Sequence, residues 1–207
     1  MPEYNTVIFD VDGTLIDTEK AVLASLQKLL SIDYNKDIDQ SELKFVLGIP
    51  GAIALPQLGI TDIAETNERW NYFMKDFFHT VTVFDGIIDL MNSLGNIGIQ
   101  QGIVTSKTKI ELQNDFVPFD LMKYLSHVVC ADDTAKHKPN PDPLLKFLEI
   151  SNANHEASIY IGDTIYDYEC ARDAGIDFGL ALWGCKNHEH IPATYKFVKP
   201  QDLLKII

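Results

Sequence analysis

Short apolar runs alternate with stretches of helical periodicity along most of the chain. Residues 4–9 end in the apolar run Val7-Ile8-Phe9 directly before Asp10, a pattern that predicts a buried strand. Similar runs predict further strands at residues 101–104, 127–130, 158–161, 178–182 and 195–198. Apolar residues at three- and four-residue spacings predict helices at residues 18–30, 87–94, 107–114, 142–150, 164–174 and 201–207. Such alternation is typical of a parallel sheet that helices cover on both faces.

One long segment interrupts the alternation directly after the first strand. Residues 37–79 carry apolar side chains at helical spacing, and the aromatic residues between 70 and 78 are interpreted mostly as core. The simplest architecture is an α/β protein with a Rossmann-like parallel-sheet core and an inserted α-helical cap domain. The predicted core comprises residues 1–16 and 82–207, and the predicted cap comprises residues 17–81. One continuous domain with extra helices is the alternative.

Composition and charge limit the classes of partner. The chain has 207 residues, 46% of them hydrophobic, and its 17 Lys and Arg stand against 30 Asp and Glu. The formal net charge of −13 would repel a phosphate polymer, so we expect neither nucleic acid nor an anionic membrane as partner. A small phosphorylated metabolite stays compatible, because a bound divalent cation reverses the charge locally.

Targeting signals are not evident in the sequence. The apolar stretches are far shorter than the roughly 20 residues that a membrane span needs. The first residues lack the basic and apolar regions of a signal peptide. We therefore expect a cytoplasmic protein that is a monomer or a homodimer.

The three cysteines are Cys130, Cys170 and Cys185, an odd and widely spaced set. They predict no disulfide framework, and a reducing compartment with the thiols as small core residues is favoured. Cys185, His188 and His190 supply three possible zinc ligands but lack a fourth. A polar surface loop is the favoured interpretation of that segment.

Polar residues follow four of the predicted strands, at the sheet edge where ligands bind in open α/β proteins. Carboxylates, hydroxyls and cations occur there together. The four segments are Asp10-Val11-Asp12-Gly13-Thr14, Thr105-Ser106-Lys107, Lys136-His137-Lys138-Pro139 and Gly162-Asp163-Thr164.

Asp10 and Asp12 are two residues apart, so on an extended backbone both side chains face the same way. Two such carboxylates can share a magnesium ion or divide into a nucleophile and an acid/base. Asp163 adds a carboxylate at another strand end, and Asp167 follows one helical turn later. Magnesium prefers a few carboxylates together with water and substrate phosphate.

Thr105 and Ser106 lie where a strand leads into a helix. Hydroxyls and free N–H groups at a helix start can hold a phosphate, although a simple helix cap explains the pair equally well. Lys136 and Lys138 are both candidates to neutralise phosphate charge. Pro139 biases Lys138 toward an extended backbone.

The order of these segments resembles the haloacid dehalogenase superfamily of phosphohydrolases. Residues 10–17 match the first motif of that superfamily, Thr105 matches the second, and residues 162–167 match the fourth. The third motif is matched by residues 138–141, which selects Lys138 over Lys136. The helical insertion resembles the α-helical cap subclass, and the nearest resemblance is to phosphoglycolate-phosphatase-like members, including pyrophosphatase-like relatives.

The resemblance implies a magnesium-dependent phosphatase that hydrolyses a small phosphomonoester through an aspartyl-phosphate. Asp10 would be the nucleophile, and Asp12 would protonate the leaving oxygen and then deprotonate water. Mg²⁺ would be held by Asp10, the backbone carbonyl of Asp12, and Asp163.

The resemblance also assigns groups that hold the substrate. Thr105, Ser106 and Lys138 would bind the phosphoryl oxygens, and Asp167 would orient the metal shell or Lys138. Many relatives carry Asn in place of Ser106, whose side chain is shorter but still forms hydrogen bonds.

Two alternatives stay open within the same fold. A sugar-phosphate mutase is disfavoured, because mutases of this cap class usually carry His where this chain has Val22. A non-catalytic phosphate-binding protein would not need both Asp10 and Asp12. Phosphoglycolate, sugar phosphates, nucleotides and pyrophosphate are all compatible substrates.

Overall fold

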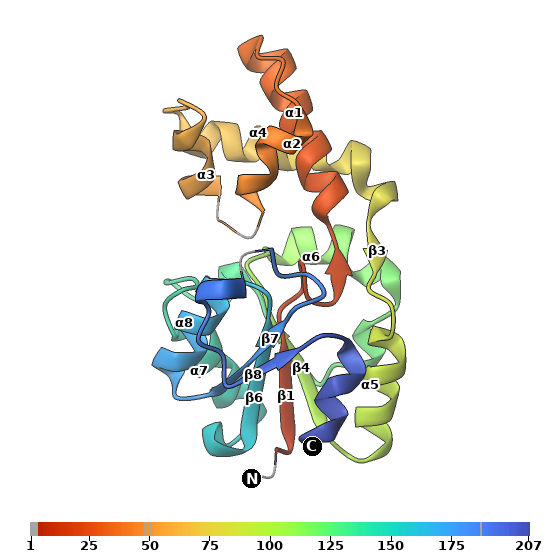
Figure 1. Cartoon of the computed structure of the whole chain (residues 1–207). Helices are drawn as coiled ribbons and strands as arrows, with labels where there is room; N and C mark the ends of the chain where they lie inside the picture. The colour runs from red at the N-terminus through yellow and green to blue at the C-terminus, as the bar shows by residue number, and fades with distance from the viewer. Residues whose placement is uncertain (1–3, 48, 50, 187) are drawn as a thin grey trace. The chain divides into compact units, whose positions relative to one another are not determined.

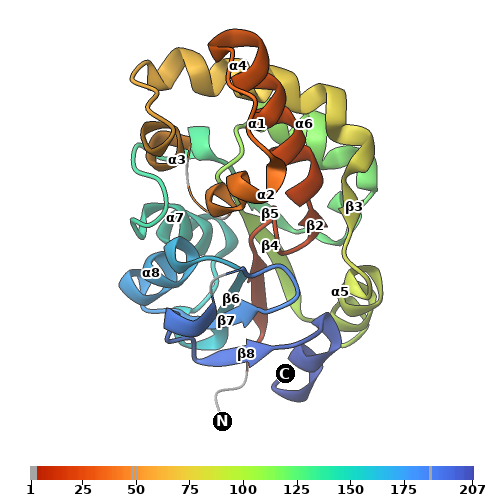
Figure 2. The same cartoon turned by 45° about the horizontal axis from the view of Figure 1, so that its top comes forward.

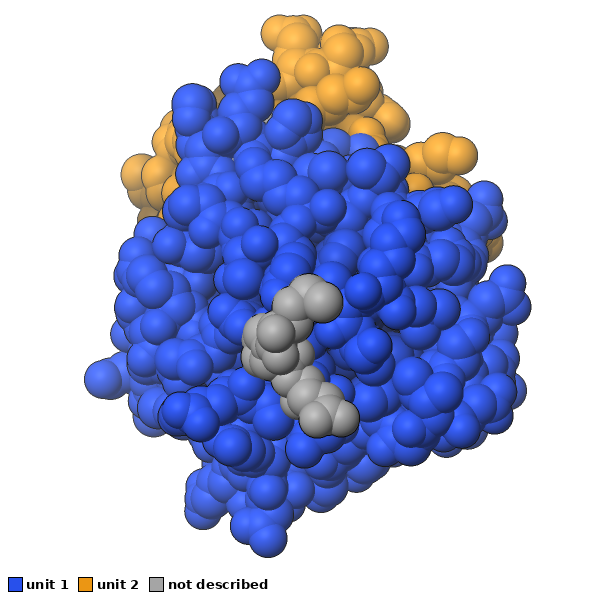
Figure 3. All heavy atoms as spheres, turned by 60° about the horizontal axis from the view of Figure 1, so that its bottom comes forward, with its two compact units in different colours: residues 1–16, 83–207 blue, residues 17–82 orange. Residues whose placement is uncertain are grey.

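The structure is a computed structural model that describes residues 4–47, 49, 51–186 and 188–207. The chain divides into two compact units, one of residues 1–16 and 83–207 and one of residues 17–82 (Figure 3). The two connections between the units, β2 (Ile16–Asp17) and β3 (Thr82–Val83), pair with each other as a small sheet. The assignment of these units as a catalytic core and a cap stays a prediction.

The first unit is built on a six-stranded sheet in the order β5-β4-β1-β6-β7-β8 (Figure 1). The pairings between neighbouring strands of this sheet are parallel, which confirms the predicted α/β class. The strands are β1 (Thr6–Phe9), β4 (Gln100–Val104), β5 (His127–Val129), β6 (Ser158–Gly162), β7 (Asp177–Ala181) and β8 (Tyr195–Phe197).

Strand β1 lies near the middle of this sheet, and all of its residues are buried. Phe9 is level with Ile103 of β4 on one side and with Ile161 of β6 on the other. The chain adds β4 and β5 on one side of β1 and then β6, β7 and β8 on the other. Ligands bind at such a reversal of strand order, beyond the carboxyl ends of the strands.

Helices cover both faces of this sheet (Figures 1 and 2). On one face Ile8 and Tyr160 of the sheet pack against Phe147 and Cys170, which come from α7 and α8; α5 lies on the other face. The α-helices of this unit are α5 (Ile87–Asn96), α6 (Lys109–Asp115), α7 (Asp142–Ser151) and α8 (Ile165–Ala174). Its 3₁₀ helices are Val117–Phe119, Met122–Tyr124, Ala131–Asp133, His155–Ala157, His188–His190 and Pro200–Lys205.

Side-chain caps fix the starts of α6 and α8. Thr108 and Glu111 form a reciprocal capping box at α6, and Thr164 and Asp167 form one at α8. Where residues 201–207 were expected to form a closing helix, the structure has the 3₁₀ helix Pro200–Lys205. A segment this short gains few hydrogen bonds as an α-helix, so the tighter 3₁₀ form competes well.

Between β2 and β3, the regular elements described in the second unit are helices. Its core joins one face of the first helix to residues of the later helices, and Trp70 Nε1 donates a buried hydrogen bond of 2.9 Å to Ser25 Oγ. Trp70 and Phe73 are core residues as expected, whereas Tyr72 is exposed. The helices are α1 (Glu19–Tyr34), α2 (Gln40–Leu43), α3 (Gly51–Gln57) and α4 (Ile63–Phe77), with 3₁₀ helices Lys44–Val46 and Phe78–Thr80.

The described part of the chain has no candidate membrane-spanning helix. Not one of the helices there combines the length and the apolar character that crossing a bilayer requires.

Candidate active site

Lys138 is the centre of a buried cluster of charges beyond β1. Its Nζ lies 2.7 Å from Asp10 Oδ1, 2.7 Å from Asp167 Oδ1 and 3.0 Å from the Tyr160 hydroxyl. The side chains of Lys138, Asp10 and Asp167 are only 7%, 8% and 2% exposed. An ammonium carries three N–H donors, so these partners use its full capacity and fix its position.

Each member of the cluster is placed by a different part of the fold. Asp10 directly follows β1, where its N–H donates to the carbonyl of Ile161 at 2.8 Å. Asp167 lies in the first turn of α8, and its Oδ2 accepts the Thr164 hydroxyl at 2.6 Å. One oxygen of Asp167 therefore caps α8, while the other holds Lys138. The capping box thus sets the position of the lysine.

Asp163 brings a further carboxylate to the same place. Carboxylate oxygens of Asp10, Asp163 and Asp167 lie within 4.8 Å of one another, and all three residues are buried. Gly13 has a φ of +79°, and a Cβ on it would overlap the Asp163 carboxylate. The loop after β1 needs glycine here because only glycine permits both the backbone conformation and the close approach.

The electrostatics of this cluster favour an additional cation. Burial, opposed by Lys138 and assisted by Asp167, raises the pKa of Asp10 to about 7. Burial, with the charges of Asp167 and Asp10, raises the pKa of Asp163 well above its usual range. Burial lowers the pKa of Lys138, but Asp10 and Asp167 outweigh that effect and the net shift is upward. When ionised, the carboxylates would thus carry more negative charge than the single positive charge of Lys138 balances.

Tyr160 is a member of the cluster that the sequence pattern did not single out. It lies in the buried strand β6, and its hydroxyl is within 3.0 Å of Lys138 Nζ, Asp167 Oδ1 and the carbonyl of Val104. The available signal was a tyrosine between Ile159 and Ile161 of a predicted buried strand, since a buried tyrosine hydroxyl needs a partner.

The remaining predicted residues differ in their exposure. Thr105 is buried just beyond β4, and its Oγ1 accepts the Lys107 N–H at 3.1 Å. Ser106 is exposed, as is Lys136, the lysine that competed with Lys138 in the sequence. The Asp12 side chain is 37% exposed, and its Oδ1 lies 3.2 Å from Lys107 Nζ.

The turn after β7 packs against the loop that carries Asp12. Trp183 Nε1 donates a hydrogen bond of 2.9 Å to the carbonyl of Thr14, 169 positions away in sequence. A Cβ on the next residue, Gly184, would overlap the carbonyl oxygen of Gly13. No local pattern indicated this contact, because it depends on how two distant loops meet.

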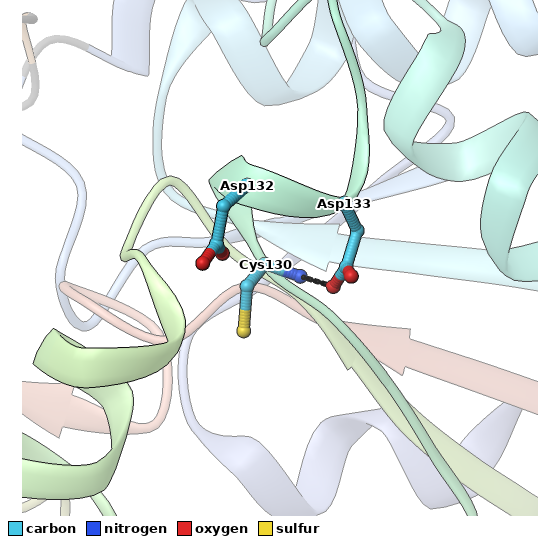
Figure 4. Close-up of side chains that lie close together, drawn as sticks. All are labelled: Cys130, Asp132 and Asp133. Atoms are coloured by element: carbon cyan, nitrogen blue, oxygen red, sulfur yellow. Dashed lines mark hydrogen bonds between the residues drawn. The ribbon is translucent and has the colours of Figure 1, made fainter.

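A second group of possible metal ligands is Cys130, Asp132 and Asp133 (Figure 4). Asp133 Oδ2 accepts the Cys130 N–H at 2.9 Å, and Asp132 Oδ1 accepts the Lys109 N–H at 3.1 Å. Asp133 also forms an ion pair with the Lys109 side chain. These bonds explain the two carboxylates as caps of a turn and a helix.

The thiols of Cys130 and Cys170 are expected to resist modification in the folded protein. Burial raises the pKa of Cys130 to about 11 and that of Cys170 to about 12. At pH 8 both groups are therefore protonated, and only the thiolate is a good nucleophile. Labelling with a disulfide reagent at pH 8 should be slow for both until denaturant is added. Rapid labelling of either cysteine under native conditions would contradict this expectation.

The segment with Cys185, His188 and His190 does not gather three ligand atoms in the residues that the structure describes. Cys185 is buried in the same apolar cluster as Ile191, whereas His188 and His190 are exposed in a 3₁₀ helix. The two histidines agree with the predicted polar surface, and the cysteine belongs to the core, as do Cys130 and Cys170.

Comparison with known proteins gives the family. Residues 7–181 match the model of the haloacid dehalogenase-like hydrolases. The pyrophosphatase PpaX of Anoxybacillus flavithermus is 28% identical over 98% of this chain and 96% of its own length. The phosphoglycolate phosphatase of Xylella fastidiosa is 31% identical over 92% of this chain and 86% of its own.

Solved structures agree with this result. The crystal structure of a Lactobacillus plantarum protein superposes with a TM-score of 0.92 at 30% identity, covering 99% of this chain and 100% of its own. A hydrolase from Pseudomonas syringae has the same fold, with a TM-score of 0.82, 24% identity and coverage of 97% and 96%. The chain belongs to the haloacid dehalogenase-like hydrolases, as the strand-end motifs predicted.

Proposed function

We propose that this hydrolase is a magnesium-dependent phosphatase that acts on a small phosphorylated substrate through an aspartyl-phosphate on Asp10. The observation that carries the proposal is the 2.7 Å contact between Asp10 and Lys138 at the end of the central strand. A buried cation beside this carboxylate supports Asp10 as the nucleophile, because the cation can hold a phosphoryl oxygen.

The reaction would proceed in two displacements. In the first, a carboxylate oxygen of Asp10 forms a bond to phosphorus while the bond to the leaving oxygen breaks. Asp12 gives its proton to that oxygen. In the second, Asp12 takes a proton from water, the water oxygen bonds to phosphorus, and the bond to Asp10 breaks. Inorganic phosphate leaves, and both aspartates return to their starting states.

The other residues would hold the substrate in line. Lys138 must exchange part of its contact with Asp10 for a phosphoryl oxygen, because its three donors are already used. Asp167 and Tyr160 would keep the ammonium in place during this exchange. Thr105 and Ser106 would donate to the other phosphoryl oxygens from the end of β4.

The residues present fit Mg²⁺. When ionised, the buried carboxylates of Asp10 and Asp163 would carry more negative charge than Lys138 balances, and their oxygens are close enough to share one ion. Asp10, the backbone carbonyl of Asp12, and Asp163 would hold the ion, with Asp167 behind them. When bound, Mg²⁺ would offset the repulsion between the Asp10 carboxylate and the phosphate.

Pyrophosphate and phosphoglycolate are the first substrates to test, because two similar proteins carry the names of these activities. We expect phosphate release from one of them, or from another small phosphate ester, that requires Mg²⁺ and is lost with a chelator. Acid-quenched protein should carry the phosphoryl group on the peptide containing Asp10, and Asp10→Asn should neither turn over nor be labelled.

Turnover that survives in Asp10→Asn would contradict the proposal. Phosphate binding without turnover on any substrate would instead favour the non-catalytic alternative. Transfer of phosphate within a sugar phosphate, without its release, would favour the mutase.

A further inference from the structure

Lys107 is a largely buried lysine that the two displacement steps do not use. Its side chain is 11% exposed, and its Nζ lies 3.2 Å from Asp12 Oδ1 and 3.4 Å from Asp115 Oδ2. Its backbone is fixed on both sides, because its N–H donates to Thr105 Oγ1 at 3.1 Å and its carbonyl accepts the Ala131 N–H at 2.8 Å. The Lys107 side chain therefore extends from a fixed backbone position, and its ammonium has two acidic partners.

Asp115 is the second acidic partner of the Lys107 ammonium, beside Asp12. It is the last residue of α6, a helix whose start is capped by Thr108 and Glu111. The Asp115 side chain is 18% exposed, and burial raises its pKa, whereas Lys107 lowers it. Because Asp115 belongs to a helix with a fixed start, the position of its carboxylate relative to Lys107 is also fixed.

The arrangement repeats the one around Asp10. Lys138 connects Asp10 to Asp167 on α8, and Lys107 connects Asp12 to Asp115 on α6. Each of the two aspartates that would act on phosphorus or on protons is thus held by a buried lysine that a helix carboxylate anchors.

We propose that Lys107 is a positioning residue for Asp12. The inference rests on the proposed function, in which Asp12 transfers protons. Such a group must lie within about 2.6–3.2 Å of the atom that it protonates. Asp12 is exposed enough for its side chain to rotate. The contact with Lys107 restrains Oδ1 and leaves Oδ2 for the leaving oxygen.

The test compares two aryl phosphates whose leaving oxygens differ in basicity. Phenyl phosphate releases a more basic oxygen than p-nitrophenyl phosphate, so it depends more on Asp12. Lys107→Met should lower kcat/KM by about 10- to 100-fold on phenyl phosphate, a part of the roughly 100- to 10,000-fold that general acid catalysis contributes. On p-nitrophenyl phosphate the loss should stay below about 3-fold, because its leaving oxygen needs little protonation.

Lys109→Met is the matched control. Lys109 lies two residues after Lys107, at the start of α6, but it is 61% exposed and pairs with Asp133. Its variant should match the wild type on both substrates. Lys107→Arg should recover much of the lost rate, since it restores a cation at the bridge. Asp115→Asn should show the leaving-group selectivity more weakly, and it carries the test if Lys107→Met does not fold.

Equal losses on both substrates, or no loss on either, would overturn the positioning role. That outcome is separate from a failure of the proposed function. If wild-type turnover requires Asp10 but Lys107→Met shows no selectivity, only the role of Lys107 is wrong. If Asp10→Asn keeps its activity, the proposed function itself is wrong.

Discussion

Lys138→Met is expected to lower the free energy of unfolding by about 3–5 kcal/mol, because the change leaves buried carboxylates without their cation. Asp10 and Asp167 would each lose a contact of 2.7 Å in surroundings where their side chains are 8% and 2% exposed. Tyr160 would lose a hydrogen-bond partner as well. The same variant should lose hydrolysis by about 100-fold or more, the usual effect of removing one donor to a developing charge.

The loss of stability should depend on pH in a defined direction. Without Lys138, the pKa values of Asp10 and Asp163 in the folded state rise further above their unfolded values, since Lys138 lowers both. A folded state with raised carboxyl pKa values binds more protons than the unfolded state, so its stability falls as pH rises. The difference between variant and wild type should therefore be largest above pH 7 and shrink toward pH 4.

Urea-induced unfolding of both proteins without added metal measures this effect. Lys123→Met is the control, because Lys123 and its partner Asp120 are 55% and 78% exposed. Removing an exposed pair should change the unfolding free energy by less than about 1 kcal/mol. A Lys138→Met variant as stable as the Lys123→Met control would show that the cluster does not depend on its lysine.

Gly184→Ala is expected to lower kcat/KM by about 100-fold, the effect that a displacement of roughly 1 Å can have on a catalytic group. The new methyl would overlap the Gly13 carbonyl oxygen, which is backbone and cannot rotate away. Gly13 is in turn packed against the Asp163 carboxylate, so a shift of this loop moves Asp12 and disturbs Asp163. Overpacking of this kind also destabilises by about 1–3 kcal/mol.

Steady-state kinetics and thermal unfolding of two further variants separate the causes. Gly95→Ala in helix α5, where a Cβ would make only an ordinary contact of 3.7 Å with Gln101 Nε2, should leave kcat/KM unchanged. Trp183→Phe removes the bond to Thr14 without adding a clash. It should cost about 0.5–1.5 kcal/mol of stability and less activity than Gly184→Ala. Activity within 3-fold of the wild type in Gly184→Ala would contradict the proposed contact.

The sequence by itself determined the fold class and the place of the candidate site. Buried strands can be recognised in a sequence as apolar runs. Parallel strands bring their carboxyl ends to one edge of the sheet. Asp10, Lys138, Asp163 and Asp167 could therefore be predicted as neighbours from the ends of separate segments. Local chemistry also set the start of α8, where Thr164 caps the helix.

Only the tertiary structure decided which polar groups touch. Residue type alone left Lys136 and Lys138 as equal candidates until the motif resemblance selected Lys138, and the structure buries the Lys138 side chain and leaves Lys136 exposed. The bridge from Lys107 to Asp12 and the contact of Trp183 with Thr14 join segments far apart in the chain. Hydrophobic periodicity reports which face of an element is buried. It does not indicate which polar group of another segment lies within a few ångströms. That pairing depends on how loops from different strands meet.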